Sequence, residues 1–135
     1  MSVTAVLLPV GPDRYAVPAR LVREVVADPR PTRLPTAPTA LVGLFNLRGE
    51  VVPAFDTAAL LGIGHVEHAA VAVVVTTNAG PAGLIATGLP EVRVLDDELR
   101  PSELRGTSGI YDAGDGVVVM LDLEVLLGPG SAGAR

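Results

Sequence analysis

Two short apolar runs in the middle of the chain, Leu41 to Leu47 and Val51 to Phe55, are separated only by Arg48-Gly49-Glu50. Glycine adopts positive φ angles without a Cβ clash, so Gly49 suits a tight reversal between two strands. The pattern predicts a β-hairpin that buries its apolar side chains and holds Arg48 and Glu50 at its tip. A rigid cation beside an anion at the surface suits recognition of another protein better than bond-making chemistry.

Similar short apolar runs, bounded by glycine and proline, recur along the whole chain and predict further strands. We expect these strands at 3–10, 15–17, 71–77, 82–87, 91–95, 110–111 and 117–121. Short helices are expected at 57–61 and 122–127, each with an aspartate or threonine at its start and a glycine at its end. Residues 18–27 fit either a helical stretch or a brief turn that leads into a strand. The proline-rich segment 28–38 and the acidic segment 96–106 are predicted to be connections.

The absence of a long helical period favours an all-β architecture. The parts that precede residues 62–70 resemble in order the parts that follow, with hairpins, further strands and one short helix on each side. This repetition suggests two small barrels with a waist near 62–70. We expect a single domain over residues 1–128 and a flexible tail at 129–135.

Composition excludes several classes of function. The chain has ten arginines, no lysine, fifteen acidic residues and few aromatic residues, which makes it a poor nucleic-acid binder. Without cysteine, disulfides and thiolate chemistry are impossible. No apolar run is long enough to cross a membrane and no secretion signal is evident, so we expect a cytoplasmic protein without membrane insertion. The first 48 residues carry net charge +3 and the rest −8; this asymmetry fits either solvated surface or a basic end that meets an acidic partner.

Catalytic and metal-binding groups find little support in the sequence. His65 and His68 lie on either side of Glu67, but the glycines before them disfavour a helix and no third ligand can be assigned. Paired aspartates fall in turn-rich segments, where aspartate bonds its own backbone. No nucleophile-elbow serine and no phosphate-binding loop is present. We therefore expect no catalytic residue, no metal and no cofactor.

Glu24 and Arg48 remain as candidates for a functional pair. They fit two readings equally well. In the first, they form a surface salt bridge that contributes little to stability. In the second, the hairpin holds Arg48 rigidly so that its planar guanidinium reaches a carboxylate or carbonyl of a partner.

The order of motifs resembles the CheW-like family, to which the coupling protein of bacterial chemotaxis belongs. The most specific part is Asn46-Leu47-Arg48-Gly49, followed by Val51-Val52-Pro53 and Asp56. Weaker matches occur in the right order, from Tyr15 to Val25 at the start to Leu121 to Leu127 at the end. The resemblance covers nearly the whole chain.

This resemblance implies two SH3-like five-stranded β-barrels packed together, and an adaptor without catalytic activity. Members of the family bridge the cytoplasmic tip of a chemoreceptor to the regulatory domain of the histidine kinase CheA. A CheW-like interaction module in a non-chemotactic pathway is the alternative. From the resemblance we expect a partner-binding surface made of Val22, Glu24, Val25, Asn46, Arg48 and Gly49. The chain departs from the family pattern at Thr57, Ala58 and Thr87.

Overall fold

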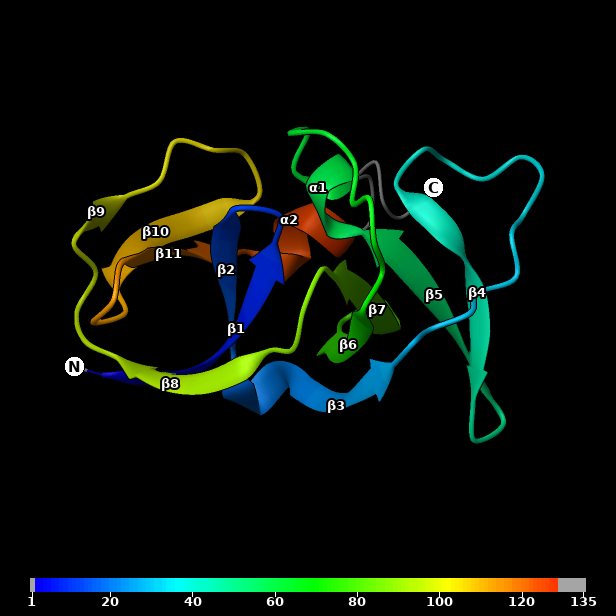
Figure 1. Cartoon of the computed structure of the whole chain (residues 1–135), viewed down its shortest axis with the longest axis horizontal. Coiled ribbons are helices and arrows are strands. Elements are labelled where there is room, and N and C mark those ends of the chain that lie inside the picture. Colours follow the sequence, from blue (N-terminus) through cyan, green and yellow to red (C-terminus); the bar gives the residue numbers. More distant parts are fainter. Residues whose placement is uncertain (1, 129–135) are drawn as a thin grey trace.

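The computed structural model describes residues 2–128, which form two β-sheets and a few short helices (Figure 1). The six-stranded sheet has the order β8-β1-β2-β11-β10-β9 and the five-stranded sheet has the order β3-β6-β7-β5-β4. The strands of the six-stranded sheet are β1 (Val3–Val10), β2 (Asp13–Pro18), β8 (Glu91–Leu95), β9 (Arg100–Pro101), β10 (Thr107–Asp112) and β11 (Val117–Leu121). Those of the five-stranded sheet are β3 (Val22–Ala27), β4 (Leu41–Leu47), β5 (Glu50–Asp56), β6 (Val71–Thr77) and β7 (Gly80–Ala86). The all-β prediction is confirmed.

The two sheets do not correspond to two consecutive halves of the chain. Each sheet takes strands from both sides of residues 62–70, and that segment connects α1 (Thr57–Leu60) to β6 beside the same five-stranded sheet. The six-stranded sheet is completed when β8 pairs with β1, and β2 then pairs in parallel with β11. The expected waist at 62–70 therefore does not separate the two sheets, because strand pairing between distant segments leaves no local signal in the sequence.

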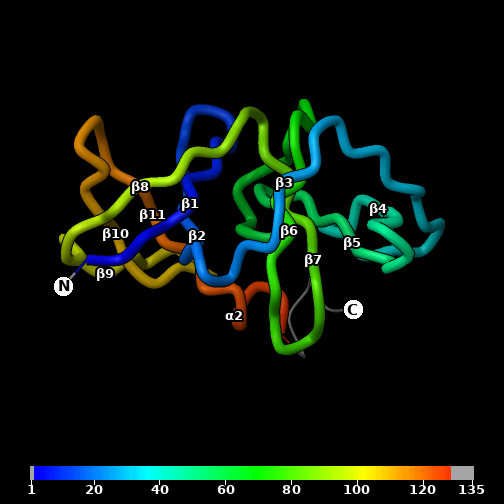
Figure 2. Tube along the Cα trace, turned by 90° about the horizontal axis from the view of Figure 1, so that it is seen from below, coloured from blue at the N-terminus to red at the C-terminus, as the bar shows by residue number. Residues whose placement is uncertain are grey.

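Two of the apolar runs are continuous because each of their strands is buried on both faces. In β1, Leu7 belongs to a cluster inside the six-stranded sheet, whereas Leu8 belongs to the large core shared by both sheets. In β6, Val73 contributes to the shared core and Ala72 to a small cluster in the five-stranded sheet. Figure 2 shows the two sheets side by side, with β1 and β6 near their junction.

The two predicted short helices and their capping residues are confirmed. The side chain of Asp56 caps α1, and that of Asp122 caps α2 (Leu123–Leu127), each by accepting a hydrogen bond from an amide of the first turn. Between β2 and β3, the structure has a single 3-10 turn, η1 (Ala19–Leu21), so the short turn followed by a strand is the correct alternative. The segment predicted as an acidic connection also holds the two-residue strand β9. The predicted tail at 129–135 lies outside the described residues.

Candidate partner-binding surface

The predicted hairpin is formed by β4 and β5, and its turn holds two consecutive residues at positive φ. Arg48 has a φ of 49° and Gly49 a φ of 88°, the combination that a two-residue hairpin turn requires to match the twist of its strands. The side chain of Asn46 stabilises this turn, because its Oδ1 accepts a hydrogen bond of 2.8 Å from the amide of Gly49. The left-handed conformation of Arg48 was not predicted, since it is uncommon outside glycine and asparagine.

Arg48 forms an ion pair with Glu24 at the start of β3. Its Nη1 donates to Glu24 Oε1 at 3.2 Å, and its Nη2 donates to Glu24 Oε2, so the contact is bidentate. The hydrogen bond with Glu24, reinforced by the carboxylate charge, raises the pKa of the Arg48 guanidinium above its usual value. The Arg48 side chain is 72% exposed and that of Glu24 is 26% exposed. The carboxylate therefore fixes the direction of a cation that faces solvent.

A second ion pair lies beside the first and has the opposite polarity, because its arginine is on β3 and its glutamate is on the hairpin. Arg23 Nη1 of β3 donates to Glu50 Oε1 of β5 at 3.1 Å. Neighbouring side chains of a regular strand point to opposite faces. Here the pairing of β3 with β6 shifts register between Val22 and Glu24, and such a bulge lets Arg23 and Glu24 reach the same hairpin.

These ion pairs join β3, at one edge of the five-stranded sheet, to the tip of the β4–β5 hairpin, which forms the other side of that sheet. The sheet begins with β3 and ends with β4, yet Thr32, shortly after β3, makes an isolated bridge to Leu44 of β4. Thr32 N donates to Leu44 O at 2.7 Å, and Leu44 N donates to Thr32 O at 2.9 Å. The segment that follows β3 therefore bridges to β4 and closes the five-stranded sheet, as in a barrel. The hairpin tip lies at that closure.

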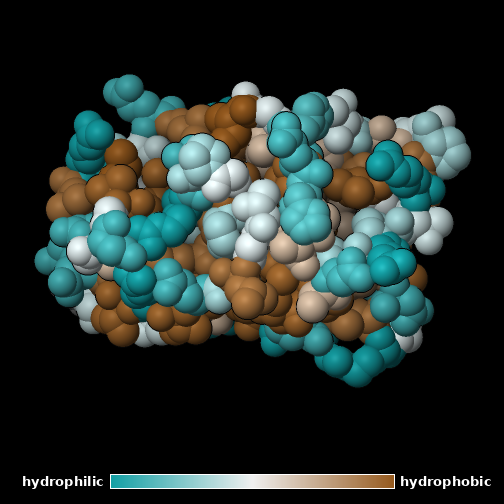
Figure 3. All heavy atoms as spheres, viewed as in Figure 1, coloured by the Kyte–Doolittle hydropathy of each residue, from teal (hydrophilic) through white to brown (hydrophobic). Residues whose placement is uncertain are grey.

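The structure brings most of the predicted partner-binding residues to this closure. Glu24 and Arg48 are in contact, and Asn46 and Gly49 form the turn next to them. Val25 of β3 is exposed, whereas Val22 is half-buried and packs against the shared core. Figure 3 shows hydrophilic residues over the lower right part of the molecule, where the hairpin tip projects, with hydrophobic residues exposed beside them.

Sequence reasoning placed Glu50 at the hairpin tip but missed its pairing with Arg23. The available signal is the charge order, since Arg-Glu at 23–24 is matched by Arg-Gly-Glu at 48–50. The proximity of these two segments depends on closure of the sheet, which no local pattern reports.

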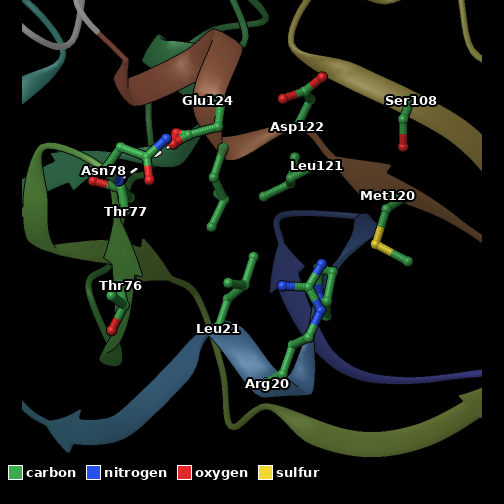
Figure 4. A pocket seen from close by; sticks show the side chains of 12 residues that line it. Arg20, Leu21, Thr76, Thr77, Asn78, Ser108, Met120, Leu121, Asp122 and Glu124 are labelled. Carbon is green, nitrogen blue, oxygen red and sulfur yellow. Dashed lines mark hydrogen bonds between the residues drawn. The ribbon is translucent and has the colours of Figure 1, made fainter.

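A groove between the two sheets was also absent from the sequence-based predictions (Figure 4). It has a volume of about 470 Å³. Leu21 of η1 and Leu121 of β11 form part of its apolar lining. At one end of the groove, Glu124 of α2 accepts a hydrogen bond of 3.2 Å from the amide of Asn78. Because η1 leads directly into β3, this groove lies close in the chain to the Glu24–Arg48 pair.

Asp56 and Asp115, two titratable groups outside this surface, have structural partners. Asp56 Oδ2 accepts a hydrogen bond of 2.9 Å from the amide of Val66 and lies 3.5 Å from His65 Nδ1. Among residues 2–128, no three histidine or acidic side chains are grouped in a way that could hold a metal ion. At the far end of the six-stranded sheet, hydrogen bonds from Arg93 and Arg14 hold the pKa of Asp115 well below its usual range.

Within the described part of the chain, no helix has the length and hydrophobicity needed to span a bilayer.

Comparisons with known proteins agree with this architecture. The family model described as a CheW-like domain matches residues 4–129. The probable chemotaxis protein CheW of Rhizobium etli is 27% identical over 127 residues, which cover 87% of this chain and 82% of that relative. The chemotaxis protein CheW of Klebsiella aerogenes is also 27% identical over 127 residues, covering 87% of this chain and 76% of that protein. The crystal structure of the scaffolding protein TtCheW from Thermoanaerobacter tengcongensis superimposes with a TM-score of 0.83 at 24% identity, covering 96% of this chain and 95% of that structure.

Proposed function

The chain belongs to the CheW-like family, and we propose that it is a non-catalytic adaptor that couples chemoreceptors to a CheA-type histidine kinase. The observation that carries this proposal is the family match over residues 4–129. In this role the protein acts in the cytoplasm, where the regulatory domain of the kinase meets the cytoplasmic tip of the receptor. Residues 1–128 act as one domain that contacts both partners.

The surface at the closure of the five-stranded sheet supports the same role. Val22, Glu24, Val25, Asn46, Arg48 and Gly49 are its proposed partner-binding residues. The exposed ion pair contributes little to stability, because exposed pairs are screened by water and salt. A guanidinium that is held in one direction next to small apolar side chains instead favours specific docking, since the partner meets a defined charge beside surface that is readily desolvated.

Reconstitution with purified partners tests the proposal. The regulatory domain of a CheA-type kinase and a receptor cytoplasmic fragment, both from the same genome, are expected to form a ternary complex with this protein. Arg48→Glu places two carboxylates together and presents the wrong charge, so we expect affinity for at least one partner to fall about tenfold or more.

Arg30→Glu is the matched control, because Arg30 is also an exposed arginine, 85% exposed and paired with Asp28 at 3.0 Å. It reverses the same charge in the connection between β3 and β4, and we expect it to bind normally. Normal assembly by Arg48→Glu would refute the proposed surface, and failure of the wild-type protein to bind either partner would refute the adaptor role.

A further inference from the structure

Four charges of alternating sign lie where the hairpin tip meets β3. Arg48 and Glu50 flank Gly49 at the tip, and each is held by a residue of opposite charge on β3, Glu24 for Arg48 and Arg23 for Glu50. The two tip residues are the more exposed member of each pair, with 72% for Arg48 and 46% for Glu50, against 26% for Glu24 and 39% for Arg23. The tip therefore presents a cation and an anion side by side, each fixed from behind.

This arrangement has no net charge, because two arginines face two glutamates. It therefore adds little long-range attraction for a partner, in contrast to a patch of one sign. These charges act once the two proteins are in contact. Like charges placed together then weaken the complex, and complementary charges fix its orientation. Val51, which follows Glu50, is 59% exposed and supplies apolar surface beside the charges.

We propose that the partner of this surface presents a basic side chain to Glu50 next to an acidic side chain for Arg48, and that the Arg23–Glu50 pair selects for this polarity. The inference rests on the proposed function, since it describes the partner that docks on the same surface. It adds Arg23 and Glu50 as specificity-determining residues. A partner with two acidic groups in these positions is rejected by Glu50, although it satisfies Arg48.

A reversal of the second pair alone tests this inference. The double variant Arg23→Glu with Glu50→Arg keeps the net charge and leaves opposite charges facing each other, but it inverts the polarity shown to the partner. We expect a loss of affinity of about tenfold or more, because two like charges then meet in the complex. The neutral variant Arg23→Gln with Glu50→Gln is expected to bind with an intermediate affinity and a weaker dependence on salt.

The matched control is Asp28→Asn with Arg30→Gln, which removes an exposed ion pair outside the proposed partner-binding surface. Its N–O distance is 3.0 Å, close to the 3.1 Å between Arg23 and Glu50. Asparagine is tolerated at the positive φ of Asp28, which is 49°. Circular dichroism and urea unfolding establish that each variant is folded. If the reversed variant does not fold, the neutral variant Arg23→Gln with Glu50→Gln is used in its place. The inference is overturned if this neutral variant binds the partner with the same affinity as the wild-type protein.

Affinities are measured by calorimetry against the kinase regulatory domain and the receptor fragment separately. The inference holds if Arg48→Glu and the reversed variant weaken binding of the same partner while the control binds normally. If Arg48→Glu weakens binding but the reversed variant binds like the wild type, the inference is overturned and the adaptor role stands. If Arg48→Glu binds both partners normally, the surface and the inference fail together, and absence of wild-type binding overturns the adaptor role itself.

Discussion

Gly43 allows the five-stranded sheet to close, and its replacement by alanine is the most direct perturbation of that closure. A Cβ atom at this position would lie 2.4 Å from Thr32 O and 2.7 Å from Thr32 C. Its φ is not in the left-handed region, so the requirement for glycine comes from space and not from backbone strain. To reach ordinary contact, the Thr32 backbone has to move by roughly 1 Å.

The expected cost follows from what that movement disturbs. Thr32 and Leu44 exchange two backbone hydrogen bonds of 2.7 and 2.9 Å, and a shift of this size weakens both. Overpacking of a filled site costs about 1–3 kcal/mol. The reduced freedom of the unfolded chain offsets about 0.4–1 kcal/mol when glycine becomes alanine. From the middle of each range we expect Gly43→Ala to lower the free energy of unfolding by about 1.3 kcal/mol, with limits of about 0 and about 2.6 kcal/mol.

Urea unfolding and amide hydrogen exchange give separate readouts of this prediction. Exchange is expected to accelerate at Thr32 and Leu44, because the bridge between them opens. Gly88→Ala is the control, since Gly88 also has no positive φ and its new Cβ would meet only side-chain atoms of Pro9, the nearer being Cγ at 3.3 Å. The reasoning is refuted if Gly43→Ala is as stable as Gly88→Ala and keeps both amides protected.

Three further predictions concern buried and charged side chains. Thr57→Val removes the buried hydrogen bond of 2.7 Å from Thr57 Oγ1 to Ile85 O, so the free energy of unfolding, measured in urea, should fall by about 1–2 kcal/mol. Asp56→Ala removes acceptors for two amides and should cost about 1–3 kcal/mol in the same assay, whereas Asp122→Ala, which removes one, should cost about 1 kcal/mol. Because the pKa of Asp115 is lowered in the folded protein, its ionised carboxylate stabilises the fold at pH values above the unfolded-state pKa of about 4. This stabilisation is lost progressively as the pH falls below that value. Asp115→Asn should therefore show a smaller decrease in urea midpoint than the wild type between pH 5 and 2, and an equal decrease would refute this linkage.

The elements that the sequence predicted well are those with local causes. Gly49 marks the central reversal because a positive φ is needed there, and Asp56 and Asp122 mark helix starts because their side chains accept from the first turn. Each of these signals acts over a few residues. The hairpin, both helices and the two doubly buried strands were accordingly predicted close to their observed positions.

Features that depend on closure were not accessible in this way. The pairing of β1 with β8 joins residues such as Val6 and Val92, and both sit in apolar patterns that many other pairings would satisfy equally well. Nothing near Arg23 in the sequence indicates its partner, because its contact with Glu50 depends on β3 lying beside the hairpin tip. The hairpin and its Arg48 were therefore predictable, whereas the second ion pair was visible only in three dimensions.

The residues that we expected to depart from the family pattern, Thr57, Ala58 and Thr87, have structural roles away from the charged tip. Thr57 is fully buried, and Ala58 is 5% exposed next to the shared core. Thr87 Oγ1 accepts from the amide of Gly11 and donates to Pro9 O, which fixes the turn between β1 and β2. Because these residues stabilise the barrels, their replacement should alter stability before it alters recognition. Changes at Arg23 and Glu50 should do the reverse, since exposed ion pairs contribute little to folding but define the charges that a partner meets.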